Sequence, residues 1–139
     1  EKYYTKVYKN YDKIKQEIDW ITENKIEYIT DANFESKVSG KDKFSDATSV
    51  IIVEFYANFN KHNAFQGWEK LTGVKYYRCD IADSPSSKKK YRVRTTPTIM
   101  IFVDGVLETT FKASLDFLCP VELPELKEAI QDAKKSSQF

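Results

Sequence analysis

One stretch of this chain decides its fold: Val53-Glu54-Phe55-Tyr56-Ala57-Asn58-Phe59-Asn60-Lys61-His62-Asn63. Its first residues complete an apolar run over Val50–Tyr56 that only Glu54 interrupts. A run that is apolar at almost every position predicts a central strand covered on both faces. The remaining residues are mostly polar and include no cysteine. The stretch therefore predicts a buried strand that passes into a polar turn.

The rest of the chain alternates strand and helix patterns. Thr98–Val103 is a second β-branched run, and Asp104-Gly105 followed by residues 106–111 predicts a hairpin. Residues 123–133 predict a closing amphipathic helix, with a proline and a glutamate in its first turn. This order is typical of an α/β domain whose sheet ends in an antiparallel pair.

Three short motifs stand in an order known from one protein family. The decisive stretch is similar to Val-Glu-Phe-Tyr-Ala-Pro-Trp-Cys-Gly-His-Cys, and residues 26–34 are similar to an opening strand that ends in Leu-Thr-Asp-x-Asn-Phe. Residues 91–99 resemble Tyr-Gly-Val-Arg-Gly-Tyr-Pro-Thr-Ile, the segment that carries the family's cis-proline. Over residues 26–130 the chain thus resembles thioredoxin-fold domains of the protein disulfide isomerase type. A weaker resemblance links it to atypical thioredoxin-related transmembrane proteins of the endoplasmic reticulum.

The resemblance implies an α/β thioredoxin fold, with a mixed central sheet flanked by helices and a cis bond between Thr96 and Pro97. Two departures are expected. Only residues 64–73 separate Asn63 from the next strand, so the second helix must be short, and residues 1–25 have no counterpart in the minimal domain. We therefore expect an N-terminal amphipathic helical extension over 1–25, a thioredoxin-like domain over 26–135 and a tail over 136–139.

The extension carries apolar residues at alternating spacings of three and four, which is a heptad pattern. They are Tyr4, Val7, Tyr11, Ile14, Ile18 and Ile21. Docking of this helix on its own domain, over the surface that the short second helix leaves bare, is the favoured interpretation. The alternative is an interface for a partner or a dimer.

The family's Cys-Gly-His-Cys is replaced here by Asn60-Lys61-His62-Asn63. An amide offers no thiolate, so neither asparagine can attack or hold a disulfide. This replacement predicts that the domain is not an enzyme and has lost disulfide oxidoreductase activity. Asparagine is a good helix cap, so the pair is expected to cap the second helix. His62 is the lone histidine, which favours neither a catalytic pair nor a metal site.

Glu54 is a lone acid in a strand expected to be buried, so it needs a partner. The family has a lysine on the next strand at the position of Arg78, and we predict a buried pair between Glu54 and Arg78. In the family this pair and an arginine matching Arg94 assist proton transfer to a thiol. Without a thiol we interpret them as structural; a thiol-free catalyst built on Glu54, Arg94 and His62 is the alternative.

Two cysteines, Cys79 and Cys119, are too few and too far apart to indicate a disulfide framework or a metal centre. Each is expected to be a small buried hydrophobe. The alternative function that they leave open is an atypical thiol oxidoreductase using Cys79 or Cys119.

Peptide binding is the function that remains. In thioredoxin folds the cis-proline loop, the active-site turn and the following hairpin form a shallow groove to which a strand can add. The residues expected to line it here are Tyr56, Phe59, His62, Thr96 and Pro97, with residues 111–114. We therefore predict a redox-inactive, chaperone-like or scaffold module that binds protein or unfolded peptide; a third possibility is an architectural domain that assembles through residues 1–25.

Composition excludes several other classes. A chain of 139 residues with 41% hydrophobic content can bury one core, and 22 basic against 21 acidic side chains leave a net charge of only +1. No nucleic-acid partner, cofactor or metal is expected, and membrane tethering would need segments outside this chain. The cluster Lys88-Lys89-Lys90-Tyr91-Arg92 with Arg94 favours a solvated helix face over a site for an acidic partner. The resemblance implies the endoplasmic reticulum, as part of a larger protein, with the cytoplasm as the alternative.

Overall fold

Five strands form one mixed sheet in the order β1-β3-β2-β4-β5. The computed structural model describes residues 26–39 and 49–136, so the heptad residues 4–21, predicted to dock on the domain or alternatively to form an interface, lie outside the described residues. The elements in chain order are β1 (Glu27–Ile29), α2 (Phe34–Ser39), β2 (Val50–Tyr56), η1 (Asn58–Asn63), η2 (Trp68–Lys70), β3 (Lys75–Asp80), α3 (Pro85–Lys90), β4 (Thr98–Val103), β5 (Val106–Lys112) and α4 (Leu123–Ser136). Strands β1, β3 and β2 are parallel, and β4 and β5 are antiparallel to their neighbours.

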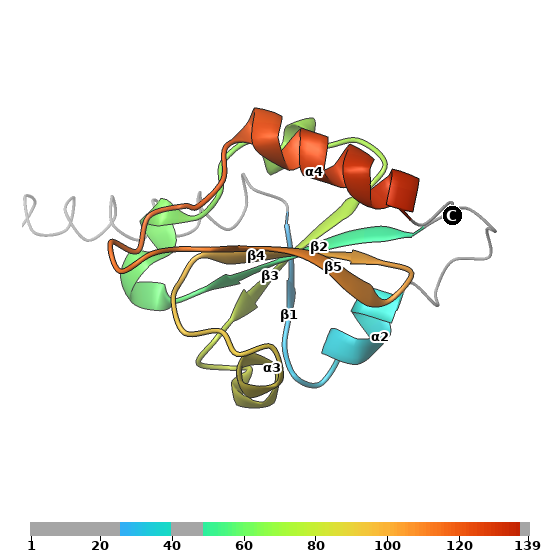
Figure 1. Cartoon of the computed structure of the whole chain (residues 1–139). Helices are drawn as coiled ribbons and strands as arrows, with labels where there is room; N and C mark the ends of the chain where they lie inside the picture. The colour runs from blue at the N-terminus through green and yellow to red at the C-terminus, as the bar shows by residue number, and fades with distance from the viewer. Residues whose placement is uncertain (1–25, 40–48, 137–139) are drawn as a thin grey trace, which may run out of the picture.

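The sheet is covered on both faces, as the apolar run of β2 predicts. Helix α4 lies across one face, and α2 and α3 lie on the other (Figure 1). Side chains of β2 alternate between two cores: Ile52 joins the α4 side, whereas Val53 and Phe55 join the side of α2. The mixed α/β sheet and the closing hairpin are confirmed.

The hairpin between β4 and β5 turns at Asp104 and Gly105, whose φ angles are 50° and 86°. Two positive φ angles in a two-residue loop suit the right-handed twist of the strands. The Asp104 carboxylate also accepts a hydrogen bond from the Ser49 backbone N–H at 2.9 Å. This turn therefore fixes the register of β4, which starts directly after the cis-proline.

Helix α3 is short, and a carboxylate from another loop binds its first turn. Asp31, from the loop after β1, accepts hydrogen bonds from the backbone N–H groups of Ser86 and Ser87 at 2.9 and 2.8 Å. Burial opposes ionisation of Asp31, but the hydrogen bonds from Ser87 and Ser86 outweigh it and lower its pKa.

At the C-terminal end of α3, Arg92 has a φ of 54°, and the Val93 N–H donates to the Lys88 carbonyl at 2.9 Å. Glycine usually occupies such a left-handed position after a helix.

The second helix of the fold is reduced to the 3₁₀ turns η1 and η2. The short length was predicted, but the capping role of the asparagines was wrong. Ala57 precedes η1 without a side-chain cap, and Asn60 itself leaves helical geometry with φ −129° and ψ 28°. The asparagine side chains are used elsewhere, in contacts with two distant loops.

Candidate functional site

Asn60 joins the turn after β2 to the loop before β4. Its side-chain Nδ2 donates to the Thr96 carbonyl at 2.8 Å and to the Phe117 carbonyl at 3.3 Å. Its Oδ1 accepts from the Thr96 hydroxyl at 3.1 Å. Asn60 and Thr96 are both buried. The amide thus bridges the backbone on the N-terminal side of the cis-proline and the loop after β5.

Asn63 reinforces the same connection. Its Nδ2 donates to the Phe117 carbonyl at 2.9 Å, so one carbonyl accepts from both asparagines. Asn60 and Asn63 both lie in η1, directly after β2. The two asparagines thus form a noncovalent tie between three loops.

The Thr96–Pro97 peptide bond is cis. The Ala113 N–H donates to the Pro97 carbonyl at 3.2 Å, and the Thr95 hydroxyl donates to the Ala113 carbonyl at 2.6 Å. Pro97 is buried. The cis-proline loop is therefore held from two sides, by Asn60 and by Ala113, the residue that follows β5.

An exposed apolar patch lies on the outer side of this tie. Phe59 is 67% exposed and packs edge-on against the half-buried Phe117, with ring centroids 5.5 Å apart. Leu115 and Leu118, from the same loop as Phe117, are 87% and 53% exposed. Sequence reasoning named Phe59 but missed the other three. The sequence does carry a signal for them, because residues 115–118 contain three apolar side chains in a predicted loop.

The structure does not bring all predicted groove residues together. His62 is exposed on η1, beside the patch in sequence. Tyr56 is half-buried, and its ring packs on Tyr28 of β1 at 6.0 Å, so it faces the β1 side of the sheet rather than β4. Burial, followed by the nearby Asp80 charge, raises the pKa of Tyr56. Tyr56 is thus part of the sheet's packing.

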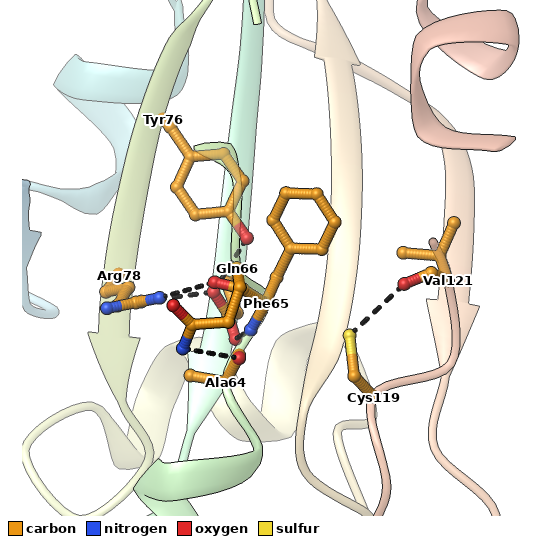
Figure 2. Close-up of polar contacts among 8 residues, drawn as sticks. Ala64, Phe65, Gln66, Tyr76, Arg78, Cys119 and Val121 are labelled. Atoms are coloured by element: carbon orange, nitrogen blue, oxygen red, sulfur yellow. Dashed lines mark hydrogen bonds and ion pairs between the residues drawn. The ribbon is translucent and has the colours of Figure 1, made fainter. Parts of the chain in front are cut away.

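Glu54 is the centre of a buried polar cluster beneath η1. It accepts from the Tyr76 hydroxyl at 2.6 Å, the Arg78 Nε at 3.1 Å and the Phe65 N–H at 2.8 Å. Arg78 Nη2 donates in turn to the Phe65 carbonyl at 2.8 Å. Figure 2 shows Tyr76, Arg78 and the Phe65 backbone facing one another. Glu54 and Arg78 are completely buried, and the pair anchors the backbone that follows η1.

The charges of this cluster stabilise one another. Burial disfavours the charged guanidinium, but the Glu54 carboxylate outweighs it and raises the pKa of Arg78. Burial and the same carboxylate hold the pKa of Tyr76 well above its ordinary value. Both groups therefore keep their protons at neutral pH. Arg94 is exposed and lines a surface hollow instead.

The two thiols lie in different environments. Cys79 is fully buried in β3, its thiol donates to the Ser84 hydroxyl at 3.0 Å, and burial raises its pKa to about 11. Cys119 is partly exposed, and its thiol contacts the Val121 carbonyl at 3.4 Å, as Figure 2 shows. Burial, and to a smaller extent the Glu54 charge, raises the pKa of Cys119. Both cysteines are free.

Within residues 26–39 and 49–136, no three His, Cys, Asp or Glu side chains are grouped to hold a metal ion. In the same ranges no helix is both long and apolar enough to cross a membrane.

Comparisons with known proteins agree with this architecture. A chloroplastic M-type thioredoxin of Brassica napus is 40% identical over 58 residues, which cover 34% of this chain and 33% of that protein. Chloroplastic thioredoxin M2 of Arabidopsis thaliana is 39% identical over 56 residues, covering 34% and 30%. The chain thus spans about a third of the length of the curated relatives it matches. No model of a known protein family matches it.

Solved structures give the same result over more of the chain. A mutant thioredoxin from Halobacterium salinarum NRC-1 superposes with a TM-score of 0.59 at 18% identity, covering 76% of this chain and 88% of that one. A chain from work on thiol resolution in a yeast mitochondrial 1-Cys peroxiredoxin via the glutathione and thioredoxin systems gives 0.55 at 18% identity, covering 77% and 94%. At this identity the likeness establishes the fold alone.

The prediction that the domain has lost oxidoreductase activity is contradicted by these comparisons. The matched relatives are thioredoxins, which are oxidoreductases, and the chain retains a thiol at Cys79. The presence of asparagine at positions 60 and 63 does not by itself demonstrate loss of activity. The sheet order, the cis-proline and the similar proteins together establish that this chain is a thioredoxin-fold domain.

Proposed function

We propose that this domain binds extended segments of protein or unfolded peptide at the cis-proline loop. The observation that carries the proposal is the exposed Phe59, which packs on Phe117 and directly precedes Asn60, the residue that binds the Thr96 carbonyl. Exposed apolar clusters rimmed by polar groups mark interaction sites, because aromatic rings gain most when a partner removes them from water. The residues nearest to Phe59 in the sequence of η1 are polar, among them Asn58, Lys61 and His62.

The backbone at this site is already ordered. The Thr96 carbonyl accepts from Asn60, and Ala113 donates to the Pro97 carbonyl. A preorganised loop lowers the entropy cost of binding a peptide strand. These contacts support an extended ligand that runs along the loop with apolar side chains on Phe59.

The resemblance to disulfide isomerases extends this proposal to a biological setting. We propose a chaperone-like or scaffold role in the endoplasmic reticulum, within a larger protein. Residues 1–25 would then extend the domain or form an interface with a second copy or a partner. The thioredoxin-like unit itself is proposed to span residues 26–135, followed by the tail at 136–139.

Replacing Phe59 with alanine is expected to weaken peptide binding by about 30-fold, equivalent to about 2 kcal/mol, because the ring is an exposed anchor at the centre of the site. The measurement is fluorescence anisotropy with alkylated insulin B chain, which is extended and has no free thiol. Folding should be unaffected, since Phe59 is 67% exposed.

The matched control is Val106→Ala, which removes apolar surface from a residue 60% exposed at the far end of the sheet. It should leave the affinity unchanged. Equal losses in the two variants would contradict the proposal, as would an unchanged affinity in Phe59→Ala.

Thiol–disulfide exchange is a second candidate function, favoured by the similarity to thioredoxins and by the partly exposed thiol two residues after Phe117. The Cys119 thiolate would attack a partner disulfide, form a mixed disulfide and release the partner's second thiolate; an external thiol would then regenerate Cys119. Cys79 is a poor candidate because a pKa of about 11 leaves about one thiol in ten thousand ionised at pH 7.

The expected result is that iodoacetamide modifies Cys119 well before Cys79 in the native protein. Any insulin reduction should disappear in Cys119→Ser and persist in Cys79→Ser. The opposite pattern in either measurement would exclude Cys119 as the reactive group. Labelling in urea provides the control, because both thiols should then react at similar rates.

A further inference from the structure

Two surface hollows lie side by side next to the cis-proline loop. The first has a volume of about 480 Å³ and is lined by Lys88, Lys89, Arg92 and Arg94 together with apolar residues of α3 and its flanks. The second has a volume of about 420 Å³ and is lined by Arg92, Arg94, Thr95, Lys112 and Ala113. The two arginines belong to both hollows, so together they form one continuous basic surface.

Among residues 26–39 and 49–136, no carboxylate neutralises the charge of this surface. All five cationic side chains are exposed, and none forms an ion pair with a carboxylate of the described residues. No acidic side chain among those residues lines either hollow. Lys90, from the same helix, shows the contrast because it pairs with Glu35. A local excess of five positive charges stands out in a chain whose net charge is +1.

Arg92 stands at a position where the backbone favours glycine. Its φ of 54° is left-handed, and the family segment that residues 91–99 resemble has glycine there. A side chain at such a position costs conformational energy that glycine does not. Arg92, one of the two arginines that both hollows share, is thus placed at the expense of local stability.

The basic surface is continuous with the proposed peptide site. Thr95 and Ala113, which line the second hollow, hydrogen-bond to each other, and Ala113 donates to the Pro97 carbonyl. Lys112 is the last residue of β5, and the connection that follows it carries Phe117. A strand lying along Thr96–Pro97 would extend from the apolar patch directly over the cations.

We propose that the two hollows bind an acidic segment, rich in aspartate or glutamate, of the same polypeptide whose apolar part occupies the Phe59–Phe117 patch. The inference rests on the proposed peptide-binding function and names its substrate class. Five cations spread over two open hollows suit several carboxylates along an extended chain. No buried charged side chain lines these open hollows to hold a single small anion in one place. Nucleic acid would gain from aromatic rings for base stacking, and the described lining has none.

The experiment compares two peptides on the intact 139-residue chain. One alternates valine with glutamate, the other valine with glutamine, and both carry the same fluorophore. We expect the glutamate peptide to bind about tenfold more tightly at low salt. The advantage should fall to about twofold or less near 1 M salt, where the Debye length is about 3 Å. Inorganic phosphate should compete only weakly.

Two variants test whether the basic surface causes the preference for the glutamate peptide. Arg92→Gly should raise or preserve the melting temperature, because it relieves the left-handed φ, while it reduces the preference for glutamate. Arg94→Gln combined with Lys112→Gln should abolish most of the preference. The matched control is Lys70→Gln with Lys127→Gln, which neutralises two lysines at a hollow beside α4 and should leave the preference intact.

The outcomes separate this inference from the proposed function. If both peptides bind through Phe59 with equal affinity, the proposed function stands and the acidic preference is overturned. If the glutamate peptide binds through the hollows and Phe59→Ala has no effect, the basic site stands and the groove proposal fails. A preference lost equally in the control pair, or strong competition by phosphate alone, would overturn the assignment to an acidic peptide.

Discussion

Replacing Arg78 with leucine is expected to destabilise the domain by about 3–5 kcal/mol, because it leaves the buried Glu54 carboxylate without its cation. Glu54 and Arg78 are both inaccessible to solvent and 3.1 Å apart. The substitution also removes the donor to the Phe65 carbonyl. Domains of this size are stable by about 5–15 kcal/mol, so the loss is a large share of the total. Urea unfolding followed by tryptophan fluorescence measures it through the midpoint at constant slope.

A second substitution tests the cause. Glu54→Gln combined with Arg78→Leu removes the uncompensated charge and keeps a neutral acceptor for Tyr76 and Phe65, so most of the loss should be recovered. A double variant no more stable than the single one would contradict the charge explanation.

The strand, the hairpin and the closing helix were predictable because each rests on local chemistry. The apolar run of β2 demands cover on both faces, and Asp104-Gly105 accepts the two positive φ angles of a tight turn. The contact between Glu54 and Arg78 followed from the cost of burying a lone acid. The family resemblance supplied the neighbouring strand on which the partner stands.

The roles of the asparagines could not be predicted in the same way. Local rules favoured capping by Asn60 and Asn63, yet their partners Thr96 and Phe117 are 36 to 57 residues away. Which distant carbonyl comes close depends on how the loop after β5 folds back. For the same reason, the sequence did not predict that Phe117 packs on Phe59 or that Asp31 accepts hydrogen bonds at the start of α3. Side chains that satisfy distant backbone groups are visible only in the folded chain.

Replacing Asn60 with aspartate is expected to cost about 3 kcal/mol or more at pH 7, because it puts a buried carboxylate against two carbonyl oxygens. Asn60 donates to both Thr96 and Phe117, and aspartate cannot donate when ionised. Asn60→Ala should cost less, about 1–3 kcal/mol, since it leaves the Thr96 carbonyl without its amide donor but adds no charge. Asn63→Ala should cost only about 0.5–1.5 kcal/mol, because that side chain is half-buried and makes one bond to Phe117.

The pH dependence distinguishes this explanation from simple loss of packing. A protonated carboxyl can donate to the Thr96 carbonyl and accept from the Thr96 hydroxyl, as the amide does. The pKa of the introduced carboxyl is therefore raised above its unfolded value near 3.9, so Asn60→Asp should match the wild type most closely below about pH 4 and lose stability as pH rises through the folded pKa. Asn60→Ala should show no such recovery in acid. If the two variants have parallel stability profiles from pH 3 to pH 8, the asparagine does not hold the cis-proline loop through its amide. If the tie also preorganises the loop for peptide binding, Asn60→Ala should weaken the binding of alkylated insulin B chain at pH 7. An unchanged affinity would contradict that preorganisation.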